Sequence, residues 1–99
     1  MEVRNLEKVR SIIKDAIGLD VSYAYDDLVF PDHTAFIVQF DDENAKNYFC
    51  YFQEECKTEE RNKILDSLAT ACSKEKCSML SKGSFRLEQK GDEVDIILF

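Results

Sequence analysis

The sequence has little of the residue types that mark fibrous, disordered or membrane-spanning chains. Its 99 residues include one proline and three isolated glycines, against 44 % hydrophobic residues. This composition favours one globular domain over residues 1–99. No apolar run approaches the roughly 20 residues that a membrane helix needs. The charged N-terminal segment also has no apolar stretch of the signal-peptide kind, so we expect a cytoplasmic protein that does not bind membranes.

The motifs of common catalytic and cofactor sites are missing too. The only histidine is His33, which excludes a site built on several histidines. Isolated glycines provide no phosphate-binding loop, and no G-x-S-x-G or C-x-x-C segment occurs. Cys50, Cys56, Cys72 and Cys77 lack the tight paired spacing of structural zinc ligands, and the first and third lie in apolar segments typical of buried thiols. The sequence therefore predicts no catalytic residue, metal or cofactor.

What is present is an excess of acidic residues, and it is concentrated in the middle of the chain. The net charge is −7, and residues 19–60 hold eleven acidic and two basic residues, a net charge of −9. The flanking ranges 1–18 and 61–99 each carry a net charge of +1. Such a chain repels phosphate backbones, which disfavours direct nucleic-acid binding. The acidic excess can simply provide solubility, or it can form a docking face for a basic partner.

Two segments have the periodicity of amphipathic helices. Apolar residues recur at intervals of three and four over residues 2–17, with Glu2 near the start and Gly18 as a stop signal. A second apolar stripe predicts a helix over residues 59–76, for which Thr58 is the expected N-cap.

Alternating apolar residues predict strands at 21–25, 34–41, 46–53, 85–88 and 94–99. Residues 28–30 are expected to be extended because a proline follows them. Asp41–Asn44 has the composition of a hairpin turn, Gly91-Asp92 of another, and 81–84 of a loop.

These elements predict an α+β single domain in the order α-β-β-β-α-β-β. Short links between strands favour a mostly antiparallel sheet, with the two helices packed on one face. The other face would carry apolar side chains, which favours a homodimer through the sheet face. The residues expected there are Tyr23, Phe49, Tyr51, Ile97 and Phe99.

Two family resemblances are visible, and neither assigns a role to a residue. Pro31-Asp32 resembles the start of the PD-(D/E)xK nuclease motif, but the corresponding segment Gln39–Asp41 lacks the required lysine. The element order resembles that of type III secretion chaperones, which usually add a closing helix that this sequence lacks.

We therefore expect a small acidic protein-interaction module that is not an enzyme, of the adaptor, chaperone or inhibitor kind. Charge would steer a protein partner to the site, and apolar contacts would supply most of the affinity. The alternative is a small-molecule-binding protein or small enzyme with a pocket near His33, Asp32 and Cys56. The predicted binding residues are Asp26, Asp27, Asp41, Asp42, Glu43, Tyr23, Phe49, Tyr51, Glu54 and Glu55.

Overall fold

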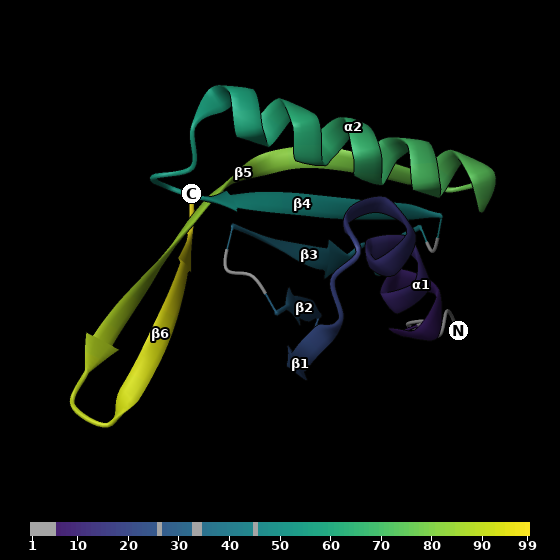
Figure 1. Ribbon diagram of the computed structural model, residues 1–99. Helices are drawn as coiled ribbons and strands as arrows, with labels where there is room; N and C mark the ends of the chain where they lie inside the picture. The colour runs from purple at the N-terminus through teal and green to yellow at the C-terminus, as the bar shows by residue number, and fades with distance from the viewer. Residues whose placement is uncertain (1–5, 26, 33–34, 45) are drawn as a thin grey trace.

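The chain forms an α+β fold built on one curled, mixed sheet (Figure 1). The computed structural model describes residues 6–25, 27–32, 35–44 and 46–99. Within them, the helices are α1 (Leu6–Ile17) and α2 (Thr58–Lys74). The six strands lie side by side in chain order: β1 (Val21–Tyr25), β2 (Leu28–Pro31), β3 (Phe36–Phe40), β4 (Asn47–Gln53), β5 (Ser78–Lys90) and β6 (Glu93–Leu98).

The sheet is mixed rather than mostly antiparallel as predicted, because β4 and β5 pair in parallel. The prediction considered only the short links between strands, but α2 joins β4 to β5. A helix of this length carries the chain back along the sheet, so that the next strand can run in the same direction as the previous one. The other strand pairs are antiparallel.

Two segments that were not predicted as strands belong to the sheet. Residues 28–31 form β2, which raises the strand number above the predicted five. Residues 81–84, predicted as a loop, lie inside β5, which begins at Ser78 rather than at residue 85. The register opposite β4 shifts there, because Cys50 pairs with Ser81 and Tyr51 pairs with Gly83. Lys82 is thus the additional residue of a β-bulge, which strengthens the local bend and twist.

The termini of the helices follow capping rules, with one exception. The expected start of α1 at Glu2 lies outside the described residues. Gly18 follows α1 with φ +80°, and its N–H donates to the Lys14 carbonyl at 2.9 Å, as a C′ glycine does. Thr58 is the first residue of α2 rather than its N-cap; Lys57 is the N-cap, and no side chain caps the helix there. Neither helix in the described ranges is long and apolar enough to cross a membrane.

The end of α2 is a Schellman motif that brings two thiols together. Lys76 has φ +59°, and its N–H donates to the Ser73 carbonyl at 3.2 Å. The Cys77 N–H donates to the Cys72 carbonyl at 2.9 Å, and the Cys77 thiol reaches the same oxygen at 3.2 Å.

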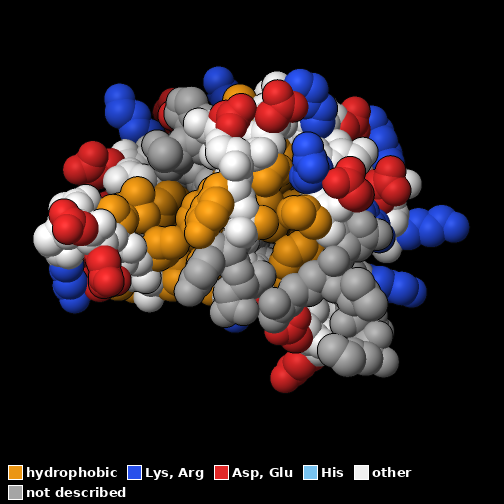
Figure 2. Space-filling view, turned by 90° about the horizontal axis from the view of Figure 1, so that it is seen from below, with side chains coloured by type: hydrophobic (Ala, Val, Ile, Leu, Met, Phe, Trp, Pro, Cys, Tyr) orange, Lys and Arg blue, Asp and Glu red, His pale blue; other side chains and the backbone are white. Residues whose placement is uncertain are grey.

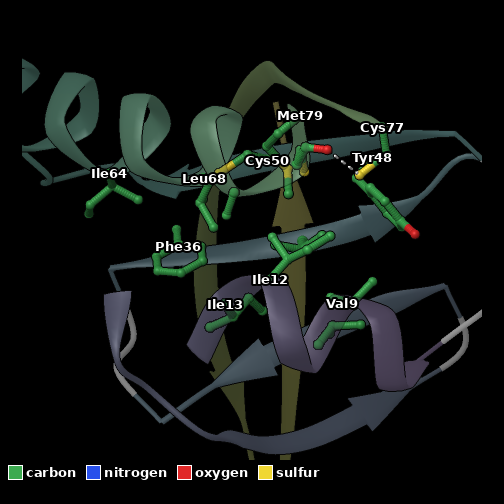
Figure 3. Close-up of a cluster of buried hydrophobic side chains, with 14 of the residues drawn as sticks. Val9, Ile12, Ile13, Phe36, Tyr48, Cys50, Ile64, Leu68, Cys77 and Met79 are labelled. Atoms are coloured by element: carbon green, nitrogen blue, oxygen red, sulfur yellow. Dashed lines mark hydrogen bonds between the residues drawn. The ribbon is translucent and has the colours of Figure 1, made fainter. Parts of the chain in front are cut away.

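The main core joins both helices to one face of the sheet, here called the helix-side face. Figure 3 shows side chains of α1, α2 and the strands pointing toward one another. The predicted alternation is correct, since Val38 of β3 and Cys50 of β4 face this core and are fully buried. The other members from these two strands are Phe36, Phe40, Tyr48 and Phe52.

Arg61 ties the start of α2 to the end of β4. Its guanidinium donates to the carbonyls of Cys56 (2.8 Å), Gln53 (3.0 Å) and Glu54 (3.2 Å) and to the Ser84 hydroxyl (3.0 Å). A guanidinium presents several donors in a fixed fork, so one side chain can hold several acceptors at once.

The second half of β5 leaves β4 and pairs with β6, so this hairpin extends away from the rest of the sheet (Figure 1). At the branch point, Ser84 and Phe99 exchange backbone hydrogen bonds of 2.7 and 2.9 Å. Gly83 allows this approach, because a Cβ built there would lie 2.3 Å from the Phe99 carbonyl oxygen.

Candidate functional site

The sheet face opposite the helices, here called the groove face, has its own apolar floor. Ile37, Tyr51 and Phe85 are buried at its centre. Partly buried side chains surround them: Leu28, Phe30, Phe49, Ile96 and Leu98. In Figure 2, which views the molecule from below, hydrophobic side chains gather in two areas on either side of a central band. Strands from both ends of the sheet contribute to the floor, because the sheet curls around it.

The margin of the groove face holds most of the exposed large apolar side chains in the described ranges. Tyr23 (57 % exposed), Leu80 (48 %), Leu87 (48 %) and Val94 (53 %) lie there, whereas Phe99 points elsewhere. Register places the last three of these on this face, since they pair with or neighbour Phe49 and Ile96. Tyr23 stacks against Phe30 with ring centroids 5.6 Å apart.

A cavity of about 430 Å³ opens between the two ends of the curled sheet. Tyr23 and Leu28 line it from β1 and β2, and Val94, Asp95 and Ile96 line it from β6. Its volume is that of a small-ligand pocket, and Asp95 is the charged residue in an otherwise aliphatic and aromatic lining.

One polar chain crosses the groove face. The Tyr51 hydroxyl donates to Gln39 Oε1 at 3.1 Å, and Gln39 Nε2 donates to Asp27 Oδ2 at 2.8 Å. The backbone carbonyl of Asp27 also accepts from Phe40 N–H at 2.8 Å. These bonds fix the orientation of Tyr51, a residue that is only 6 % exposed and forms part of the floor.

The structure separates the predicted acidic residues into two groups. Asp27, Asp41, Asp42 and Glu43 lie near the end of β3, and the Glu43 N–H donates to Asp41 Oδ1 at 2.9 Å in a local turn. Glu54 and Glu55 follow the far end of β4, roughly 20 Å away for a strand of this length. Asp26 lies outside the described residues. The acidic residues therefore do not form one continuous docking face.

The predicted aromatic residues are brought together only in part. Tyr23, Phe49 and Tyr51 share the groove face, and Lys82 Nζ lies 4.2 Å from the centre of the Phe49 ring. Ile97 and Phe99 do not share it. They pair with Arg86 and Ser84 and point to the opposite side of β6, because they are out of phase with Ile96 and Leu98. Phe99 instead meets the Arg86 guanidinium at 5.7 Å.

Apart from Tyr23, sequence reasoning missed the apolar margin of the groove face. Alternation predicts Leu87, Val94 and Ile96 as strand residues but not as surface residues, since it does not say which side of a strand is covered. Leu80 lies in a segment whose polar composition concealed the start of β5.

Of the alternative site near His33, Asp32 and Cys56, only Asp32 and Cys56 belong to the described residues. His33 lies outside them. Asp32 accepts a hydrogen bond from the Ser22 hydroxyl beside β1. Cys56 lines a separate cavity of about 610 Å³ with Ala35, Gln53, Glu54, Glu55, Glu60, Arg86 and Leu87.

The surroundings of Cys50, Cys56 and Cys72 favour the protonated thiol. Burial raises the pKa of the Cys50 and Cys72 thiols to about 12, and Cys77 adds to the effect on Cys72. Burial, with help from Glu60, also raises the pKa of Cys56, against the opposing influence of Arg61. A nucleophilic cysteine needs the reverse shift. No three His, Cys, Asp or Glu side chains of the described ranges are placed to hold a metal ion.

No family model, curated protein or solved structure matches the chain significantly. The resemblances to nucleases and secretion chaperones thus have no support from these comparisons. The groove face is identified as a candidate site from its geometry alone.

Proposed function

We propose that the protein is a non-enzymatic protein-interaction module that binds its partner through the groove face. The observation that carries the proposal is the grouping of Tyr23, Leu80, Leu87 and Val94, all about half exposed, around one apolar floor. Exposed apolar side chains that border a hydrophobic area often mark a protein-interaction site. The proposal includes a cytoplasmic location.

The role of charge in this proposal differs from the one expected from sequence. The acidic residues lie at two separate ends of β3 and β4, so they can steer a partner without forming the contact themselves. The apolar groove face would supply the affinity. A homodimer through the same face is the competing arrangement.

Affinity capture with three baits tests the proposal. The first is the unchanged protein, the second carries Leu87→Ser and Val94→Ser, and the third carries Asp41→Asn, Asp42→Asn and Glu43→Gln. We expect the second bait to lose a specific partner that the first and third retain. If the second bait retains the partner and the third loses it, the binding site lies at the β3–β4 turn and the proposal is contradicted.

A second candidate function is small-molecule binding at the cavity beside Cys56, favoured by its volume of about 610 Å³ and its mixed Glu and Arg lining. Screening small ligands by thermal shift with Glu60→Gln as the comparison variant tests it. A ligand that stabilises the parent protein but not this variant would support the candidate.

A further inference from the structure

The free edge of β6 presents its backbone and its apolar side chains from the same residues. β6 is the last strand of the sheet. Ser84 and Phe99 exchange both of their backbone bonds, and such pairs alternate along an antiparallel ladder. Glu93, Asp95 and Ile97 therefore direct their backbone groups toward β5. The N–H and C=O groups of the alternate residues, Val94, Ile96 and Leu98, point away from β5, and these residues also face the groove.

A segment lying along this edge would meet the cavity between β6 and the first two strands. Tyr23 and Leu28 stand across that cavity from Val94 and Ile96. Side chains of an added strand that lie directly opposite Val94 and Ile96 would point into it, because cross-strand neighbours share a face. One extended segment can thus use both the backbone edge and the apolar floor, which is the geometry of strand addition.

The opposite edge of the sheet is less suited to such pairing. The register between β1 and β2 shifts between Val21 and Tyr23. The register between β5 and β6 is unbroken from Phe85–Leu98 to Lys90–Glu93. Irregular edges resist the addition of a strand, whereas a regular one accepts it.

Charge decides which kind of segment fits. Residues 88–95 hold four acidic residues and one basic residue, and Asp27 precedes Leu28 on the far side of the cavity. Acidic side chains accordingly flank the hydrophobic area at the hairpin margin in Figure 2. The side chains of Glu93 and Asp95 alternate with those that face the groove, and Lys90 pairs with Asp95 at 3.1 Å. A second copy would instead bring another net charge of −7 to this edge.

We propose, building on the interaction function proposed above, that β6 binds an extended basic segment of a partner protein by strand addition. Apolar side chains at alternate positions of that segment enter the groove. Lysine or arginine side chains at the intervening positions lie beside Glu93 and Asp95, where opposite charges in neighbouring strands attract.

The probe is a fluorescent peptide of alternating valine and lysine, compared with one of alternating valine and glutamate. In fluorescence anisotropy, the lysine peptide should bind at least about tenfold more tightly than the glutamate peptide. Its affinity should fall as salt is added. Amide hydrogen exchange followed by NMR should slow at Val94, Ile96 and Leu98, but not at Asp95 or Ile97, whose N–H groups already face β5. Equal binding of both peptides, or binding without this alternating protection, would overturn the proposal.

Two further measurements distinguish strand addition from binding by side chains alone and from pairing between two copies of the chain. Ile96→Pro removes an outward N–H without removing a bond to β5, so it should weaken peptide binding about tenfold or more. If this variant fails to fold, N-methylation of one edge of the peptide makes the same test on the unchanged protein.

Slower amide exchange at β6 on raising the protein concentration without peptide would show pairing with a second copy and overturn the proposal. Loss of capture by the Leu87→Ser, Val94→Ser bait without peptide binding would reject strand addition and leave the interaction function intact.

Discussion

The two faces of the sheet carry similar side chains and meet different surroundings. On the helix-side face, Val38 and Cys50 are fully buried under α1 and α2. On the groove face, Ile37 and Phe85 are equally well buried, but only because the sheet curls around them. Toward its margin, side chains such as Leu87 remain half exposed.

This difference separates the apolar residues that fold the chain from those available to a partner. Burying an aliphatic side chain contributes about 1.5–3 kcal/mol. Folding buries the side chains of the helix-side face fully, whereas the side chains at the margin of the groove face still expose apolar surface. Apolar area of this kind provides the driving force for association.

The largest expected difference between the faces comes from truncating one leucine on each. Leu68 of α2 is fully buried in the main core, so Leu68→Ala should lower the free energy of unfolding by about 2–5 kcal/mol. Leu87→Ala should change it by only about 0.5 kcal/mol or less, because the side chain is half exposed. Urea denaturation measures both, and equal losses would contradict the contrast between the faces.

Removing Arg61 tests what holds α2, and with it the cover of the helix-side face. Arg61→Ala should cost about 1–3 kcal/mol, since three carbonyls and the Ser84 hydroxyl each lose one hydrogen bond. Arg61→Lys should recover only part of this, because an ammonium lacks the planar fork. Lys63→Ala, an exposed change in the same helix turn, is the control and should be neutral in thermal unfolding.

Gly83 tests the curl that shapes the groove face. Gly83→Ala places a Cβ against the Phe99 carbonyl and should cost about 1–3 kcal/mol. It should also disturb the Ser84–Phe99 pairing, visible as faster amide exchange at Phe99. Ser81→Ala, at an exposed site in the same strand, should leave both the stability and the exchange unchanged.

Sequence was a good guide where local periodicity decides structure. The stripe of α1 and the alternation around Val38 and Cys50 were predicted correctly, because each reflects burial against one covered side. The first half of β5 was missed because Ser81–Ser84 is polar, and only pairing with β4 makes it a strand. The parallel pairing depends on where α2 returns the chain, which local patterns do not encode.

The candidate site was predictable only in fragments. Alternation marked Val94 and Ile96 as neighbours on one face, but the bulge at Lys82 and the curl of the sheet determine what that face meets. The acidic residues drew attention because they are close in sequence. The straight run of β4 separates Asp41 from Glu54, so closeness along the chain did not become closeness in space.

Alkaline pH should destabilise the helix-side core. Burial raises the pKa of Cys50 and Cys72 from 9.0 to about 12, and that of Tyr48 from 10.0 to about 12. Between the unfolded and folded pKa values, the folded state binds more protons than the unfolded state. The stability that these groups contribute is therefore fully present below about pH 9 and is lost as the pH rises. Each group contributes a slope of about 1.4 kcal/mol per pH unit in that window.

Urea denaturation from about pH 8 to about pH 10.5 measures this slope. Cys50→Ala should lower the stability at neutral pH and flatten the alkaline slope by about two fifths, because Cys50 and Cys72 contribute from about pH 9 whereas Tyr48 contributes only from about pH 10. A slope that is unchanged in this variant would mean that the Cys50 thiol has the same pKa in the folded and unfolded states.

Substitutions at the margin of the groove face should have the smallest effect on stability and the greatest effect on partner binding. Leu87→Ser with Val94→Ser should change the free energy of unfolding by less than about 1 kcal/mol, because both side chains are half exposed in the folded protein. The same pair should reduce binding of a hydrophobic dye and abolish partner capture, since the groove margin loses its apolar area. A stability loss comparable to that of Leu68→Ala would show that the margin belongs to the core after all. Unchanged stability with lost binding is the signature of a surface that serves association rather than folding.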